Sequence, residues 1–385
     1  MKKFFVFALL ILLSAQIFAI DFGGKLSSNT RARGETFKEL KWSENASLHL
    51  WLSHLFDSKY KMKISTDGSY EFRWDQVDNS KRHIIDLNLL KFSALFPLAK
   101  NVSLDFAIGR FPVVDTTGII FNQINDGVYT KFNFTRAQLQ LYLGISRILN
   151  ANDIVMLTET ATTSVPIEKY KYPYVLNAKY IPLALSVYAP SLFANQNLTF
   201  ELWGVFDYSK EKYNRMYGTL ALAGPLAGPL FYNVSTTFGS EKFKNVSNLT
   251  SFVLSYFPVP EALLSFQTLY ASGFNGKLSA FRGVTSREAL FATGGSDFNL
   301  EYSGKLLLSL QASYTFIQAL QLSGKATAVF ACPEDKVSYD GFEGRIDVLG
   351  SVLRDLQLGA GLYGYISQNT EHNKVGLSIN ASLAF

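Results

Sequence analysis

The side chains from Tyr60 to Asp75 alternate without a break between a mostly apolar set and a polar set. The first set is Tyr60, Met62, Ile64, Thr66, Gly68, Tyr70, Phe72 and Trp74. The second set is Lys61, Lys63, Ser65, Asp67, Ser69, Glu71, Arg73 and Asp75. Successive side chains of a β-strand point to opposite faces, so this pattern predicts a strand with one apolar and one charged face.

The same period of two returns along most of the chain, whereas helical periodicity is almost absent. It is clear at 102–109, 138–145, 298–316 and 342–348. A soluble β-sandwich also alternates, so other features must decide. The polar faces carry small and charged residues, many strands exceed the roughly five or six residues of soluble strands, and short connections alternate with long ones. These features predict an all-β fold, a transmembrane antiparallel β-barrel.

Eighteen strands account for the pattern, and sixteen is the alternative count. The expected strands are 21–33, 46–56, 60–75, 83–96, 101–111, 126–134, 137–146, 174–189, 197–208, 214–223, 229–239, 248–257, 262–272, 297–316, 319–331, 339–353, 355–366 and 373–385. An even number places both termini on one side, expected to be periplasmic. The longest loops, 147–173 and 273–296, then lie on the cell exterior.

The composition suits a wall that faces lipid. Aromatic residues make up 15% of the chain and charged residues 17%, against about a quarter charged in soluble domains. Aromatic girdles and a lipid-facing apolar band explain both values, and they make outer-membrane lipid an expected partner. Cys332 is the only cysteine, so no intramolecular disulfide is possible. The net charge of +5 is too small to indicate a nucleic-acid partner.

The first nineteen residues have the layout of a secretory signal peptide. Lys2 and Lys3 precede an apolar run from Phe4 to Leu13, and Ala19 offers a small residue at the cleavage point. We therefore expect a signal peptide at 1–19 and a single barrel domain at 20–385. An uncleaved membrane anchor is the alternative. Too few residues precede the first strand for an N-terminal plug domain.

The segment from Gly109 to Gly127 resembles a known family. Gly109-Arg110 stands at a strand end, and Asp126-Gly127 opens the next strand. In this the chain resembles bacterial outer-membrane porins, in particular the alginate-export-like and related eighteen-stranded substrate-channel porins. The resemblance implies that the loop after the fifth strand, 113–125, folds into the lumen and narrows it. The chain lacks the dense arginine lining of alginate channels, so alginate is not the expected solute.

Candidate pore residues follow from this loop and from strand parity. An inward loop would let Arg110, Asp115 and Asp126 line a constriction, with Tyr129 and Lys131 facing the lumen from the next strand. Alternatively, Asp115 and Asp126 are ordinary turn residues. Strand parity predicts further lumen-facing residues. They form either a binding track for a charged solute or a solvated wall whose charges pair with one another. They are Lys61, Lys63, Asp67, Glu71, Arg73, Asp105, Lys305, Lys325, Glu343, Arg345, Asp347 and Lys374.

Catalytic and metal motifs are missing from the sequence. It holds no Gly-x-Ser-x-Gly elbow and no His-Glu-x-x-His pair. We expect no enzyme activity, no catalytic or metal site and no cofactor. The leading expectation is a passive diffusion channel for small hydrophilic solutes or ions in the outer membrane of a diderm bacterium. The rival is a surface structural or adhesive protein with a closed lumen, and a transporter of hydrophobic substrates is a third option.

The final strand, Lys374 to Phe385, carries the clearest two-faced pattern. Its apolar set is Val375, Leu377, Ile379, Ala381, Leu383 and Phe385. The terminal Phe385 resembles the signal that the barrel-assembly machinery recognises, which makes that machinery an expected partner. Pairing of this strand with the one at 21–33 would close the sheet and remove both edges.

Overall fold

The computed structural model describes residues 20–150, 155–157, 162–164, 175–176, 179–208, 212–273, 278–285, 303–317, 319–332, 336–369 and 373–385. The signal peptide expected at 1–19 lies outside these residues, as do large parts of the two long loops. Within the described residues, the one helix is a single turn at Phe37–Glu39, and no helix is long and apolar enough to cross a membrane.

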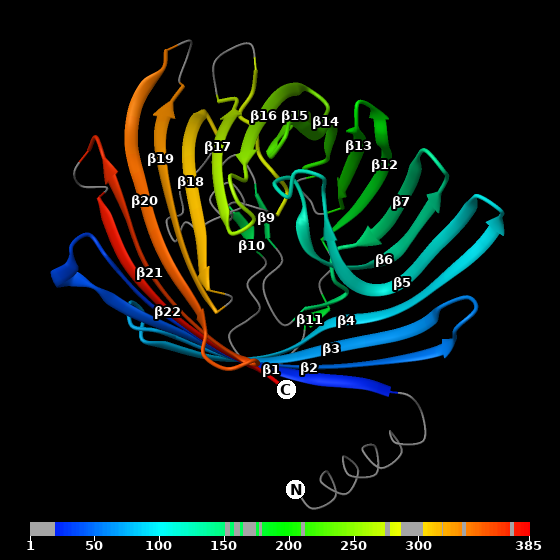
Figure 1. Ribbon diagram of the computed structural model, residues 1–385, viewed down its shortest axis with the longest axis horizontal. Coiled ribbons are helices and arrows are strands. Elements are labelled where there is room, and N and C mark those ends of the chain that lie inside the picture. The colour runs from blue at the N-terminus through cyan, green and yellow to red at the C-terminus, as the bar shows by residue number, and fades with distance from the viewer. Residues whose placement is uncertain are drawn as a thin grey trace, which may run out of the picture.

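Eighteen long strands form one antiparallel wall (Figure 1). They are β1 (Ile20–Gly34), β2 (Lys41–Asp57), β3 (Met62–Asp75), β4 (Ser80–Ala99), β5 (Val102–Val114), β6 (Asn122–Asn133), β7 (Gln138–Ile145), β12 (Tyr180–Phe193), β13 (Gln196–Asp207), β14 (Arg215–Ala227), β15 (Leu230–Glu241), β16 (Asn245–Tyr256), β17 (Ala262–Ala271), β18 (Lys305–Ile317), β19 (Leu320–Ala331), β20 (Ser338–Ser351), β21 (Leu356–Ser367) and β22 (Lys374–Ala384). The short pairs β8 (Leu149–Asn150) with β11 (Val175–Leu176), and β9 (Val155–Leu157) with β10 (Thr162–Ser164), lie apart from this wall.

The wall closes on itself. Each strand pairs with its chain neighbour, β7 pairs with β12, and β1 pairs with β22 from Lys25–Ala384 to Gly34–Val375. Closure leaves no free sheet edge. The predicted all-β barrel of eighteen strands is confirmed, and the sixteen-strand alternative is wrong. Two predicted strands start too early: 174–189 begins at Tyr180, and 297–316 begins at Lys305.

The two faces of the wall differ in chemistry. Alternate residues such as Ile64, Tyr70, Leu310 and Ile379 form an exposed apolar outer face. The intervening residues face inward, where Asp67 lies 3.8 Å from His49 and Lys131 lies 3.1 Å from Asp105. One face of β3 carries Lys63, Asp67, Glu71 and Arg73. Lys325 of β19 and Arg345 of β20 are paired in register, so they also share one face of the sheet.

Gly24 contacts the C-terminal residue where β1 meets β22. Gly24 and Phe385 exchange backbone hydrogen bonds of 2.8 and 3.0 Å. The Phe385 ring covers Gly24 so closely that a Cβ at this position would collide with it. A larger residue at position 24 would therefore require the terminal ring to move.

Candidate functional site: the lumen and its two inward-folded segments

The connection from β5 to β6, residues 115–121, is held in shape by one carboxylate. Asp115 accepts hydrogen bonds from the backbone amides of Thr117 (2.8 Å), Ile120 (2.9 Å) and Phe121 (2.8 Å). Its side chain is buried, with 3% exposure. Burial raises the pKa of the Asp115 carboxyl, and the hydrogen bonds from Phe121 and Thr117 oppose that rise. Asp115 thus organises the loop from within, and its carboxylate is turned away from open water.

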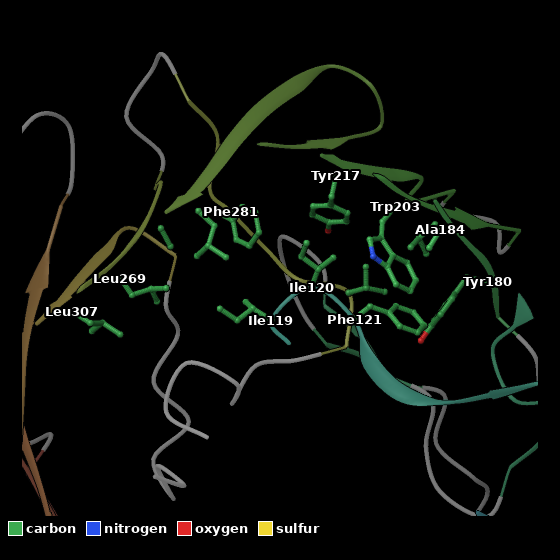
Figure 2. Packing of buried hydrophobic residues seen from close by; sticks show 14 of the residues in the cluster. Ile119, Ile120, Phe121, Tyr180, Ala184, Trp203, Tyr217, Leu269, Phe281 and Leu307 are labelled. Carbon is green, nitrogen blue, oxygen red and sulfur yellow. The ribbon is translucent and has the colours of Figure 1, made fainter. Parts of the chain in front are cut away.

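This loop folds inward and docks on the inner face of β12 to β14. Ile119, Ile120 and Phe121 are buried among side chains of β12, β13 and β14, as Figure 2 shows. The Phe121 ring stacks on Trp203 with centroids 4.8 Å apart. The Thr116 amide donates a 2.9 Å hydrogen bond to Glu201 Oε2 on β13. Aromatic stacking and apolar burial therefore fix the loop on the inner face.

A second segment, residues 278–285, meets the first inside the barrel. It belongs to the connection between β17 and β18, and its Phe281 and Val284 are fully buried in the same cluster. The Val284 amide donates to the Ile120 carbonyl (2.6 Å), and the Asn122 amide donates to Thr285 Oγ1 (2.7 Å). We refer to residues 115–121 and 278–285 together as the lumen bridge.

Two side chains of β14 anchor the second half of the lumen bridge. Arg215 Nη1 donates to the Gly283 carbonyl (2.9 Å), and the Tyr217 hydroxyl donates to the Arg282 carbonyl (2.7 Å). Arg215 also pairs with Glu241 of β15 at 3.1 Å. Arg215 is 1% exposed, so its guanidinium contacts the segment and Glu241 and has almost no contact with solvent.

The predicted constriction residues separate into two groups. Arg110 and Asp126 form a bidentate ion pair with N–O distances of 2.7 and 2.8 Å, and Arg110 also donates to the Leu87 carbonyl. The Asp126 carboxylate further accepts the Ile148 amide at 2.6 Å. Tyr129 and Lys131 have the opposite strand parity, so they lie on the other face of the β5–β6 hairpin and point into the lumen. Lys131 pairs with Asp105 there.

The other lumen-facing candidates are mostly neutralised by close partners. Arg73 pairs with Glu71 and Arg345 with Asp347, each at 2.5 Å. Lys305 pairs with Asp340, a residue that parity did not select. The structure therefore groups the candidates into local ion pairs of mixed sign.

A cavity of about 660 Å³ lies beside the end of β5, where residues 111–114 line it. Its polar lining includes Lys61, Lys91, Lys131, Asp105 and Gln140. Its aromatic lining is Phe106, Phe111, Tyr129, Tyr142 and Trp203. A second cavity of about 580 Å³, at β1 to β4, is lined by four arginines, Arg31, Arg33, Arg73 and Arg82.

Sequence reasoning missed the apolar and hydroxyl patches on the inner face. Leu269, Leu307 and Val329 occupy one rung of the ladder and are buried in the cluster that holds Phe281. Nearby, Thr219 bonds Thr237 and Ser309 bonds Thr327, each at 2.9 Å. Neutral patches thus line part of the inner wall of β14 to β19, beside the Arg215–Glu241 pair and Lys305, while β2 to β6 and β20 carry most of the ion pairs. The sequence does indicate the apolar patch in the run Leu306-Leu307-Leu308. There Leu307 occupies a position where the alternation would place a polar residue.

These features define a class: a closed eighteen-stranded barrel with an apolar exterior and a lumen narrowed by inward-folded segments. No family model and no curated protein matches the sequence. Solved structures do match. Pseudomonas aeruginosa OccK2 (OpdF) has a TM-score of 0.65 at 13% identity, over 95% of this chain and 97% of that chain.

Two more matches come from the same organism. P. aeruginosa OccK5 (OpdH) gives a TM-score of 0.63 at 10% identity, and OpdK, solved with vanillate, gives 0.59 at 10% identity. Each match covers 95% of this chain and 98% of the other. The predicted resemblance to eighteen-stranded substrate-channel porins is confirmed at the level of the fold.

Proposed function

We propose that the protein is an outer-membrane porin, a water-filled channel for passive diffusion of small hydrophilic solutes or ions. The observation that carries this proposal is the pairing of an apolar exterior with a charged lumen that the lumen bridge narrows. The structural neighbours, which are outer-membrane channels, support it. The rival reading, a surface protein with a closed lumen, gains no support from a lumen that contains cavities of several hundred Å³.

Export and assembly form part of the same proposal. Residues 1–19 act as a cleaved signal peptide, and residues 20–385 form the mature barrel in contact with outer-membrane lipid. The strand that ends in Phe385 is recognised by the barrel-assembly machinery and then closes against β1. The chain has no catalytic role and takes no cofactor.

The 660 Å³ cavity is the proposed resting place for a solute. Lys61 and Lys91 supply positive charge, and Tyr129, Tyr142 and Phe111 supply flat apolar surface. This combination suits a small organic anion with an apolar body. OpdK was solved with vanillate, an aromatic carboxylate, so vanillate is a suitable first solute to test. Tyr129 and Lys131 line the path, and Arg110, Asp115 and Asp126 hold its constriction in place.

Planar-bilayer recording of the refolded protein tests the channel directly. Stepwise conductance increments are expected as single barrels insert, and addition of vanillate should reduce the current if it occupies the cavity. A barrel that inserts, judged by protease resistance in vesicles, but conducts no ions would contradict the proposal. The adhesive alternative would be favoured if the full-length protein bound host matrix and a variant with residues 147–173 shortened did not.

A further inference from the structure

A groove of about 960 Å³ crosses the outer face of the barrel from β16 to β22, strands that lie side by side (Figure 1). Its side walls are two ridges of exposed apolar residues. Phe342 of β20 and Ile366 of β21, which are paired in register, form one ridge. Ile346 and Leu362, also paired, form the other. The groove lies on the opposite side of the wall from the lumen, so the proposed channel function does not use it.

The floor of the groove is made of small residues from four neighbouring strands. Gly344 of β20 pairs with Ala326 of β19 and with Gly364 of β21. Beside them, Gly324 of β19 pairs with Ala312 of β18. All five residues line the groove. The groove is therefore deep because its floor has almost no side chains.

The space above the three floor glycines is open. A Cβ built on Gly344 would find its nearest neighbour in the Phe342 ring at 3.7 Å. On Gly324 and Gly364 the nearest atom would be a backbone oxygen, at 3.7 and 3.6 Å. These are ordinary contact distances, so the packing of the barrel does not itself require glycine at these positions.

Backbone geometry does not require glycine there either. None of the three glycines has a positive φ, and strand pairing is regular at each of them, so they mark no bulge. The inward-facing Gly376 differs, because the Tyr363 ring covers it and a Cβ would collide with that ring. Glycine inside a strand also marks places where a ligand or another backbone approaches closely. The floor glycines therefore indicate a contact from outside the barrel.

The surroundings of the groove specify an apolar occupant. The groove is continuous with the exposed apolar outer face, to which Leu310 on its border belongs. In the outer membrane, where the structural neighbours lie, hydrocarbon contacts that face. The charged residues bordering the groove, such as Lys325 and Arg345, have inward parity, and Arg345 pairs with Asp347 on the inner face. An occupant therefore meets no charged side chain on the outer face.

The width of the groove favours a lipid chain over a second copy of the barrel. Phe342 and Ile346 flank Gly344 on β20 and stand four residues apart, which is about 13 Å between Cα atoms. A single hydrocarbon chain can enter between these ridges and contact both walls and the floor. The outer face of a second barrel is broad and convex, so it would rest on the ridges and leave the floor without dispersion contacts.

We propose that this groove binds a hydrocarbon chain of an outer-membrane lipid and holds it against the barrel wall. Phe37, in the turn between β1 and β2, borders the groove, as does Tyr256, the last residue of β16. These residues lie at opposite ends of the strands, so the groove reaches from one rim of the barrel toward the other. The inference depends on the outer-membrane location and not on the proposed channel.

Photolabelling tests this site. The full-length protein is refolded into vesicles containing a small fraction of phosphatidylethanolamine with a diazirine on one acyl chain, and labelled residues are located by peptide mass spectrometry. Labelling of Ile346 and Ile366 should exceed that of Met216 and Leu220, which are exposed on the outer face of β14, by several-fold. The double variant Gly344→Leu, Gly364→Leu fills the floor. It should lower the labelling of the two isoleucines to the level seen on β14.

Gly218→Leu is the matched control. Gly218 pairs with the outward-facing Leu202 and Phe238, outside the groove, so its variant should keep the wild-type labelling pattern. If the double variant does not fold, Gly344→Ala replaces it, because a Cβ fits there, and labelling should fall in part.

Three outcomes would overturn the lipid site. They are equal labelling of the groove and of β14 in the wild-type protein, unchanged labelling in the filled variant, and cross-links at the ridges between two protein chains in place of lipid. The conductance of the double variant should equal that of the wild type, because the groove lies outside the lumen. Failure of the channel proposal would appear instead as an absence of conductance in both proteins, with the labelling pattern intact.

Discussion

Arg110 shows how one buried side chain can join three neighbouring strands. Its guanidinium joins β5 to Asp126 of β6 and to the Leu87 carbonyl of β4, at 6% exposure. Strand parity alone distinguishes this pair from Tyr129 and Lys131, which face the lumen. The sequence showed that charged residues cluster here, but their pairing depends on the register between β5 and β6, which composition does not reveal.

Replacement of Arg110 tests this structural role. Arg110→Ala leaves the partly buried Asp126 without its main partner and should lower the free energy of unfolding by about 3–5 kcal/mol. Urea titration in lipid vesicles, followed by tryptophan fluorescence, measures the change. Arg73→Ala is the comparison: Arg73 is 43% exposed and pairs with Glu71, so its loss should cost about 0–1 kcal/mol. Equal effects would rule out a special role for the buried pair.

The facing of single residues on β22 can be measured in the same assay. Ile379 is 59% exposed on the outer face, so Ile379→Arg should cost about 2–4 kcal/mol if the site lies near the bilayer midplane. The next residue, Asn380, lines a small inner cavity, where an added charge reaches water. Asn380→Arg should therefore have a much smaller effect. The reverse order would invert the assignment of inner and outer faces.

At the scale of elements, the strands were predictable and the inward segments were not. A period of two located β3 and β22 closely, because lipid on one side and water on the other impose that period on each strand. The lumen bridge depends instead on contacts between distant residues, such as Thr116 with Glu201 and Asn122 with Thr285. Local patterns carry no information about such contacts. The resemblance to porins was the one sequence-level indication that 113–125 enters the lumen.

Shortening of the β5–β6 connection tests its role in the constriction. Val114 and Asn122 are paired in register, so residues 115–121 can be replaced by Asn-Gly, which favours a two-residue hairpin turn. The conductance should rise, because this half of the lumen bridge is gone. The same exchange at 242–244, between the paired Glu241 and Asn245, should leave the conductance unchanged. An unaltered conductance in the first variant would show that the loop does not limit flow.

At the scale of the whole molecule, the lumen has two unlike sides. The lumen bridge packs against a buried apolar cluster on the inner wall of β12 to β19. Charged pairs on β3, β5 and β6 line the other side, and a further pair lies on β20 next to β19. The cavities of about 660 and 580 Å³ are lined mainly by residues of β1 to β6 and their connections. Charge on that side should therefore set ion preference.

Ion selectivity measures that influence. The double variant Lys61→Gln and Lys91→Gln removes two positive charges from the 660 Å³ cavity. Its reversal potential in a salt gradient should shift toward cation preference. Lys81→Gln is the control, because Lys81 is exposed and lies in register with Trp74, on the outer parity of β3. A shift of the same size in the control would mean that overall charge, and not the cavity, determines selectivity.

The long sequence separation within the lumen bridge has a consequence for assembly. Its two halves lie more than a hundred and fifty residues apart, as the bond from Asn122 to Thr285 shows. Contacts between distant segments form late, since the intervening chain must first be ordered. We therefore expect the newly closed barrel to pass through a stage in which the wall is complete and the passage is still wide. Each newly closed barrel then lets solutes leak across the membrane until the lumen bridge has docked. The rate of docking therefore limits how much of the protein a cell can make without excessive leakage.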